Sequence, residues 1–150
     1  FNMKIDFTII TSEKILEILP LLSVLNTKTP IEILEKRVLE MAELPNYECA
    51  TLYVNNELVG ITGLWYSTRH YIGKTVEADH VFIKTAFRGQ KLGKKFFDWI
   101  HTHVQHKGCE AIELNSYTNN TKSHKFFYNE GYKVYGFHFL KVVRKDNNFY

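Results

Sequence analysis

A strand-like run that passes through a glycine-bearing turn into an amphipathic helix constrains the fold more than any other feature. Residues 75–84 (TVEADHVFIK) have the composition of a strand. Residues 89–107 repeat Phe96, Ile100 and Val104 at helical spacing, and Gly108 marks the stop. When such a helix directly follows a strand, it packs against the sheet that contains the strand. The chain is therefore expected to form a layered α/β or α+β domain.

The rest of the chain supplies further strands and helices around this unit. Predicted strands are residues 3–10, 47–54, 58–66 and 109–115, with one or two more within 132–143. Predicted helices are residues 12–26, kinked or divided at Pro20, residues 31–44 after the start signal at Thr29-Pro30, and a short helix capped by Asn120 that ends before Gly131. Residues 55–57 form a hairpin turn and residues 67–74 a loop.

Length and composition limit the chain to one domain and to a few functional classes. With 150 residues, we expect a single core over residues 3–150, with Phe1 and Asn2 as additions before a natural start at Met3. No apolar run approaches the ~20 residues of a membrane span, and no secretory leader is visible. Cys49 and Cys109 lie in apolar runs and are expected to be buried free thiols, which favours the cytoplasm. A net charge of +3 is too weak to indicate nucleic acid.

The turn before the 89–107 helix has the character of a phosphate site. Its backbone N–H groups point out of a helix N-terminus, which carries partial positive charge, and glycine allows a ligand to approach closely. The turn is neither a Walker loop nor a dinucleotide fingerprint. A capped helix with a solvated basic face is the alternative interpretation. The cations of this cluster are Lys84, Arg88, Lys91, Lys94 and Lys95.

Two segments together resemble the GNAT superfamily of acetyl-CoA-dependent N-acetyltransferases. Arg88-Gly89-Gln90-Lys91-Leu92-Gly93 matches the family's phosphate signature, and the run from Asn120 to Tyr132 matches its later signature. The resemblance implies a GNAT-like fold, in which a mixed, mostly antiparallel sheet is splayed at the cofactor site and flanked by about four helices. It also implies an enzyme that moves an acetyl group from acetyl-CoA to a primary amine by direct attack, without a metal.

The resemblance also implies which residues hold acetyl-CoA. The pyrophosphate is expected on the turn, and the pantetheine arm along the open edge of the preceding strand. Three departures stand out: Lys91 replaces a glycine, Ser123 replaces an alanine, and Phe127 replaces a tyrosine that acts as general acid in many members. The implied cofactor residues are Val81, Phe82, Ile83, Arg88, Gly89, Gln90, Lys91, Leu92, Gly93, Lys94, Asn120, Ser123 and Phe127.

Acetyl transfer requires a neutral amine, and only about one lysine-like amine in a thousand is neutral at pH 7.4. A general base is therefore useful, and Asp79 is the first choice. Glu77 and His80 are alternatives; strand alternation places Glu77 and Asp79 on one face and His80 on the other. Tyr128 is the remaining candidate acid, but it is expected to face solvent or the following strand.

The acceptor amine is expected between the N-terminal helices and the 66–74 loop. Candidate acceptor residues are Tyr66, Arg69, His70 and Tyr71. The diamine acetyltransferase branch, another small amine, a peptide N-terminus and a lysine side chain all stay open. An acyl-CoA sensor of the same fold and a nucleic-acid binder are the rival functions, and a homodimer is an option that family members often take. The spacing of His101, His103 and His106 does not favour a metal site.

Overall fold

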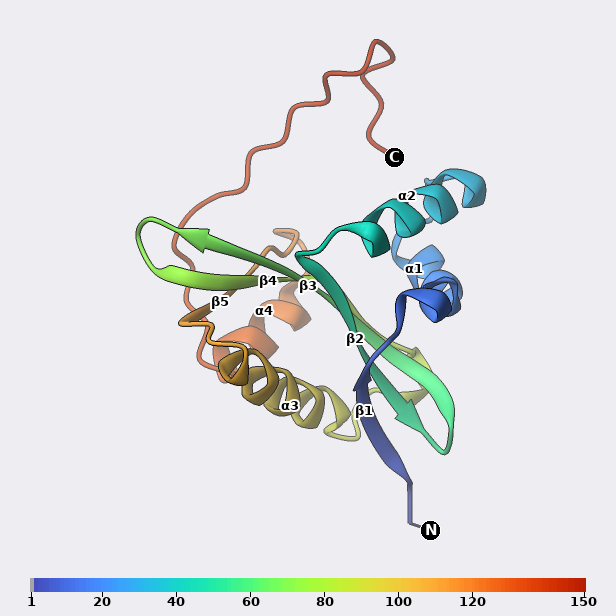
Figure 1. The fold of residues 1–150 in the computed structure, drawn as a ribbon, viewed down its shortest axis with the longest axis vertical. Helices are drawn as coiled ribbons and strands as arrows, with labels where there is room; N and C mark the ends of the chain where they lie inside the picture. Colours follow the sequence, from blue (N-terminus) through green and yellow to red (C-terminus); the bar gives the residue numbers. More distant parts are fainter. Residues whose placement is uncertain (1) are drawn as a thin grey trace.

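A twisted sheet of five strands, in the order β1-β2-β3-β4-β5, separates two layers of helices (Figure 1). The computed structural model describes residues 2–150. In chain order the elements are β1 (Ile5–Ile9), the 3₁₀ helix η1 (Ser12–Ile18), α1 (Leu19–Leu25), α2 (Ile31–Glu43), β2 (Tyr47–Val54), β3 (Glu57–Arg69), β4 (Gly73–Ile83), the 3₁₀ turn η2 (Thr85–Phe87), α3 (Leu92–His106), β5 (Ala111–Leu114) and α4 (Thr121–Asn129). This arrangement confirms the predicted mixed sheet flanked by helices.

In the described part of the chain the sheet is antiparallel from β1 to β4, and β4 and β5 run parallel. The two-residue turn between β2 and β3 has positive φ at Asn55 (49°) and Asn56 (67°), as the right-handed twist of a tight hairpin requires. The β4–β5 pairing ends at Ala78↔Leu114, although β4 continues to Ile83. Within residues 2–150 the last five residues of β4 therefore have no strand partner on the β5 side, and the sheet is splayed there.

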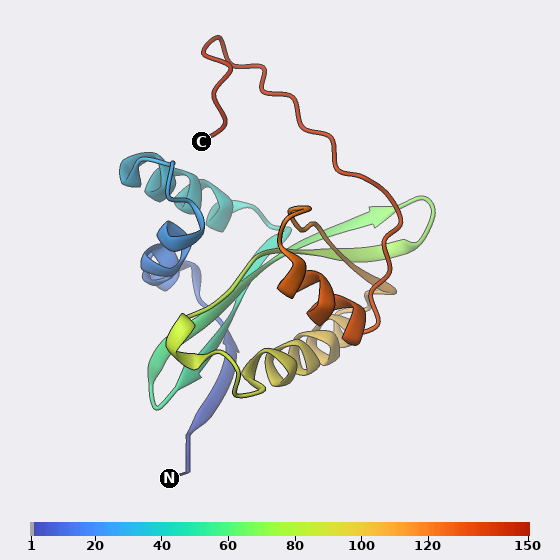
Figure 2. The same cartoon turned by 180° about the vertical axis from the view of Figure 1, so that it is seen from behind.

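Helices lie over both faces of the sheet (Figures 1 and 2), and each face carries its own hydrophobic core. On one face α3 buries Phe96, Ile100 and Val104, the residues expected from helical spacing, against the sheet. On the other face η1, α1 and α2 pack over Ile61 and Phe82. The helices are stable because their apolar stripes are covered by the sheet, so the two layers hold the central strands between them.

Helix boundaries differ from the sequence expectation by a few residues. The 12–26 segment divides into η1 and α1, and Pro20 lies in the first turn of α1, where its missing N–H costs nothing. The α2 helix has Pro30 as its N-cap residue and no capping hydrogen bond from a side chain. The α3 helix begins at Leu92 rather than near Gly89, because positive φ angles at Gly89 and Lys91 interrupt the helical path.

The predicted loop over residues 67–74 is wrong, because β3 and β4 continue their pairing to Arg69↔Gly73. Only three residues connect the two strands, and Gly73 has a φ of 84°, which suits glycine. The tip of this hairpin projects at one end of the sheet in Figure 1.

The one or two strands predicted within residues 132–143 are absent. Within residues 2–150 this segment has no strand pairing, and it leaves the body as a single extended trace (Figure 1). Its alternating composition suits a strand, but a strand forms only when its backbone groups find a ladder partner. In this chain the segment passes the outer edge of β5 without pairing to it.

The prediction that both cysteines are buried free thiols is confirmed in part. Cys49 is buried, whereas Cys109 is half-buried, and both thiols are free. In the part of the chain that is described, no helix has the length and apolar character needed to cross a membrane.

Asn120 caps α4 as predicted, because its side-chain oxygen accepts a hydrogen bond from the Ser123 N–H (3.4 Å). We expect Asn120→Ala to lower the free energy of unfolding by about 1 kcal/mol, the usual effect of losing an N-cap. Urea denaturation measures this change. Asn119→Ala is the matched control, because the exposed neighbour Asn119 is not the cap, and an equal loss in both variants would contradict the assignment.

Candidate active site

The N-terminus of α3 presents backbone donors that the helix itself does not satisfy. No side chain of residues 2–150 caps this end, and the first hydrogen bond of the helix runs from the Lys95 N–H to the Lys91 carbonyl (3.2 Å). The N–H groups of Leu92, Gly93 and Lys94 therefore point out of a helix of 15 residues. Such an end attracts an anion through both its donors and its dipole.

The turn before α3 uses two left-handed residues. Gly89 has a φ of 75°, and a β-carbon there would meet no atom within 4 Å, so its backbone conformation rather than crowding calls for glycine. Lys91 also has a positive φ (60°) and stands where the family signature has glycine. A lysine in this conformation costs roughly 1 kcal/mol, which the rest of the fold offsets.

Gly93 lies beside both the end of β4 and α4. A β-carbon added to it would lie 3.6 Å from the Ile83 and Phe126 side chains, which is ordinary contact. Packing within the protein therefore does not require glycine at this position, and the small residue leaves room on the side from which an anion would approach. Phe126 is a neighbour of Gly93 that the sequence did not predict. Its position one residue before Phe127 on α4 was the only sequence feature that pointed to it.

Arg88 and Lys94 are engaged by the protein itself. The Arg88 Nε donates to the Ile83 carbonyl (2.8 Å), and its guanidinium lies 5.4 Å from the Phe82 ring centroid, so it ties the turn to the end of β4. The hydrogen bond from Lys94 to the Asp98 carboxylate (3.1 Å) raises the pKa of Lys94. Gln90 makes a long contact from its amide nitrogen to the Ala86 carbonyl (3.5 Å).

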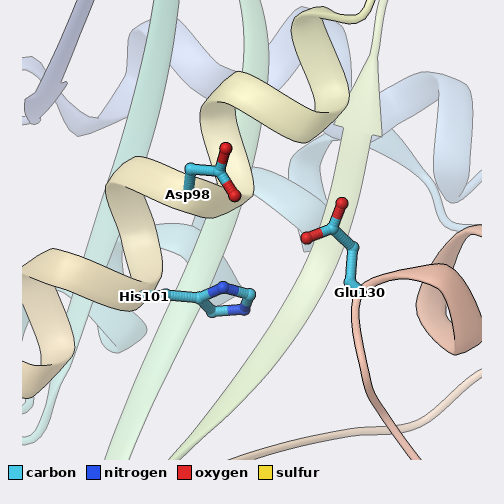
Figure 3. A group of neighbouring side chains, drawn as sticks. All are labelled: Asp98, His101 and Glu130. Atoms are coloured by element: carbon cyan, nitrogen blue, oxygen red, sulfur yellow. The ribbon is translucent and has the colours of Figure 1, made fainter.

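Asp98, His101 and Glu130 come together beside α3, as Figure 3 shows, with their ligand-type atoms within 4.8 Å of one another. The Lys94 ammonium lies 3.6 Å from the Glu130 carboxylate and also bonds Asp98, so one cation pairs with both carboxylates. The Nε2 of His101 forms a hydrogen bond with the Tyr132 hydroxyl (2.8 Å). The cluster is thus a charged network that ties α3 to the end of α4.

A β-bulge changes the faces expected for the catalytic candidates. The β3–β4 register shifts between Ile61 and Gly63, and His80 takes a φ of 36°. The imidazole consequently lies over Gly63, where a β-carbon would overlap it, and its Nε2 is 2.8 Å from the Tyr47 hydroxyl. The expectation that His80 faces away from Asp79 is therefore wrong: strict alternation fails at a bulge, and both side chains belong to the Tyr47 and Trp65 face.

Asp79 is an exposed carboxylate that two donors hold in place. Its Oδ2 accepts from the Trp65 indole N–H (3.2 Å), and its Oδ1 accepts from the His80 backbone N–H (2.8 Å). The Trp65 ring in turn packs against Tyr47, with ring centroids 4.5 Å apart. The carboxylate therefore has a defined position at the start of the open β4 edge and stays accessible to a second molecule.

His80 is half-buried, whereas Asp79 is exposed. Burial lowers the pKa of His80, although the nearby Asp79 carboxylate acts in the opposite direction, so the imidazole is neutral near pH 7. Its Nδ1 is buried and has no hydrogen-bond partner within the described chain. Because its Nε2 hydrogen-bonds with the Tyr47 hydroxyl, the imidazole is placed to orient that hydroxyl.

The remaining chemical candidates have separate environments. Glu77 accepts a hydrogen bond from the Asn115 amide (2.8 Å). Phe127 is buried, its ring centroid 6.0 Å from that of Phe97, so its ring contributes to the core. Tyr128 is 58% exposed, which confirms that it faces solvent.

The predicted acceptor residues do not gather around Asp79. Tyr66 donates to Glu48 (2.5 Å) and packs on the α3 face of the sheet. Arg69 and Tyr71 both contact Glu113 on β5, at 3.5 and 2.7 Å, and His70 packs edge-on against Tyr71. The hairpin tip lies six pairs along the ladder from Asp79, on the order of 20 Å at the rise of a strand.

A small cavity lies instead at the other end of β4, on the side of the N-terminal helices. Its volume is about 280 Å³. It is lined by Pro20, Leu21, Val24, Phe82, Lys84 and Thr85. Apart from Lys84 the lining side chains carry no charge. This pocket therefore lies between α1 and the end of β4.

The sequence matches a family model and a curated relative. The model of the acetyltransferase (GNAT) family matches residues 18–132. The aminoalkylphosphonate N-acetyltransferase of Salmonella typhimurium is 28% identical over 100 residues, which cover 66% of this chain and 65% of that protein. The matched region thus spans slightly less than two thirds of the relative.

Solved structures share the fold at low sequence identity. An aminoglycoside N-acetyltransferase in complex with CoA superposes with a TM-score of 0.83 at 14% identity, covering 96% of this chain and 97% of that one. A ribosomal-protein-alanine N-acetyltransferase from Brucella melitensis superposes with a TM-score of 0.73 at 17% identity, covering 94% and 99%. At these identities the likeness establishes the fold.

Proposed function

Because the chain belongs to the acetyltransferase (GNAT) family, we propose that it transfers an acetyl group from acetyl-CoA to the primary amine of a small molecule. The observation that carries the proposal is the geometry at the splayed sheet. An uncapped N-terminus of α3 and an unpaired β4 edge lie next to each other, and Asp79 stands where that edge begins.

The unpaired edge and the helix end suit the two ends of one cofactor. The backbone groups of Val81 and the N–H of Ile83, whose carbonyl already accepts from Arg88, are left for an extended amide-containing arm, as in strand addition by a ligand. The N–H groups at residues 92–94 suit the pyrophosphate. The family resemblance supports placing acetyl-CoA across both features, with Asn120 and Ser123 acting mainly through the α4 cap.

Asp79 is the proposed general base. The carboxylate is exposed, so it can take a proton from the ammonium of the acceptor directly or through one water. The neutral amine then attacks the thioester carbon, and the oxyanion that forms takes a hydrogen bond from a backbone N–H near Val81 or Phe82. The C–S bond breaks as the oxyanion collapses, and the attacking nitrogen loses its extra proton to solvent or to the leaving sulfur, so CoA leaves as the thiolate or thiol.

The leaving thiolate does not need a tyrosine. Its pKa of about 8.5 makes it a tolerable leaving group near neutral pH. Tyr128 is exposed, and Phe127 has no proton to donate. We therefore expect Tyr128→Phe to change turnover less than about threefold at saturating acetyl-CoA, whereas a drop of a hundredfold would make Tyr128 the general acid.

The lining of the cavity near Lys84 guides the choice of acceptor molecule to test. An apolar lining with one cation suits an amine that also carries an anionic group, as the name of the Salmonella relative describes for that protein's substrate. A polycationic aminoglycoside would need more carboxylates than this cavity offers. We propose a small amine with an anionic substituent as the first acceptor to test.

The free thiols support a cytoplasmic location.

Two measurements test the function. Calorimetry measures acetyl-CoA binding, and a thiol assay measures CoA release with a panel of aminoalkylphosphonates, aminoglycosides, diamines and peptides with free N-termini. Release that depends on one class of amine would support the transferase and identify its acceptor. Tight acetyl-CoA binding with no release on any amine would favour the acyl-CoA sensor, and no binding would contradict both.

A further inference from the structure

The side chains of Asp98, His101 and Glu130 offer two carboxylates and one imidazole to a common point between α3 and the end of α4 (Figure 3). Asp98 and His101 are three residues apart on α3, so they share one face of the helix. Glu130 reaches them from the C-cap of α4. Carboxylate oxygens and an imidazole nitrogen are donors that proteins use for divalent transition metals.

Glu130 is the buried member of this cluster. Only 7% of its side chain is exposed, compared with 56% for Asp98. Within residues 2–150 no N–H or O–H group donates a hydrogen bond to its carboxylate, and the nearest cation is the Lys94 ammonium at 3.6 Å. Charge-assisted hydrogen bonds to a carboxylate are normally about 2.7–2.9 Å long. The negative charge of Glu130 is therefore directed into the cluster and is only partly compensated.

Lys94 marks where a cation is held in this cluster. Its Nζ lies 3.1 Å from Asp98 and 3.6 Å from Glu130, so one positive charge contacts both carboxylates. The Lys94 side chain is 62% exposed, and its flexible stem allows the ammonium to turn into solvent. A divalent ion carries twice the charge and accepts lone pairs from all three groups, whereas an ammonium can only donate hydrogen bonds.

His101 has the hydrogen-bond arrangement of a metal ligand. Its Nε2 lies 2.8 Å from the Tyr132 hydroxyl, which leaves Nδ1 for an ion. A histidine that binds a metal usually donates its other ring N–H to a polar partner, and this outer hydrogen bond fixes the orientation of the ring. The Tyr132 hydroxyl is in the position of that partner.

We propose that Asp98, His101 and Glu130 bind one divalent transition-metal ion, with Zn²⁺ as the best fit, in place of the Lys94 ammonium. Their ligand atoms lie within 4.8 Å of one another, and tetrahedral Zn²⁺ with bonds of about 2.05 Å needs them about 3.4 Å apart, so no pair closes by more than about 1.4 Å. The exposed Asp98 side chain has room for this movement.

The ion would fasten α3 to the end of α4. The α3 helix covers the sheet face opposite Tyr47 and Trp65, the face to which Asp79 belongs, so the ion stabilises the fold and takes no part in acetyl transfer. Spacing along the chain could not indicate this site, because Glu130 meets α3 only in the folded structure.

Calorimetric titration of ZnCl₂ into the full, tag-free chain tests the site. One ion per chain is expected, and His101→Ala should weaken binding by at least about a hundredfold, the upper end of what losing an outer hydrogen bond costs. His106→Ala is the matched control, because this exposed histidine lies at the end of the same helix, and it should leave the affinity unchanged. Equal affinities of wild type and His101→Ala, or no binding by the wild type, would overturn the proposal.

Two further variants test the details without removing a ligand. Lys94→Met should bind Zn²⁺ more tightly than the wild type, because the competing ammonium is gone; equal or weaker binding would contradict displacement of Lys94. Tyr132→Phe keeps the ring in the core and should weaken binding about tenfold.

Anomalous scattering at the zinc edge locates the ion in crystals grown with ZnCl₂. A peak between Asp98, His101 and Glu130 is the expected result, whereas peaks only elsewhere on the surface would mean an adventitious ion only. At a hundredfold excess over the dissociation constant, Zn²⁺ should also raise the melting temperature by about 5–10 °C, and Asp98→Asn should reduce this shift. An unchanged shift in Asp98→Asn would contradict the site. Neither measurement depends on acetyl transfer.

Discussion

Asp79→Asn is expected to lower turnover about a hundredfold while acetyl-CoA affinity stays near that of the wild type. The amide keeps the shape of the side chain and can still accept from the Trp65 indole, but it cannot take a proton from an ammonium ion. The loss should become smaller as the pH approaches the amine's own pKa of about 10.4, because more of the acceptor is then already neutral. Steady-state rates against pH, with cofactor binding measured separately, check both parts.

Glu77→Gln is the matched control for Asp79. Glu77 lies two residues earlier on β4 and has its own partner, Asn115, so neutralising it should change turnover much less. A loss that stays the same at every pH in Asp79→Asn would indicate a structural role. Glu77 would then be tested as the base, and His80 as a group that orients Tyr47.

Gly93→Glu is expected to weaken acetyl-CoA binding by well over tenfold. The substitution places bulk and a negative charge beside the N–H groups that would hold the pyrophosphate. Calorimetric titration of the folded variant measures the change. Unchanged affinity would show that the cofactor binds elsewhere.

Gly93→Ala separates this electrostatic effect from packing. The added β-carbon would lie 3.6 Å from Ile83 and Phe126, and the φ of Gly93 is not positive, so the alanine variant should fold normally. Its affinity should fall much less than that of Gly93→Glu. If both variants lose binding equally, close approach of the ligand to the backbone rather than charge determines the affinity.

Local patterns in the sequence were sufficient for the elements that form the cofactor end of the site. The spacing of Phe96, Ile100 and Val104 fixed the buried face of α3, and Asn120 marked the start of α4. The glycine-bearing turn indicated a helix N-terminus open to an anion. These features depend on residues within a few positions of one another, so periodicity and capping preferences suffice to predict them.

Pairing between distant segments decided the rest. The bulge opposite Ile61 and Gly63 turned His80 onto the face of Asp79, and continued pairing from Ser67 to Arg69 replaced the loop expected to hold the acceptor. Arg88 reached back to Ile83, and the 132–143 segment was left without a partner despite its strand-like composition. Strand register, bulges and ladder partners arise from hydrogen bonds between segments far apart in the chain, so only the tertiary structure could determine them.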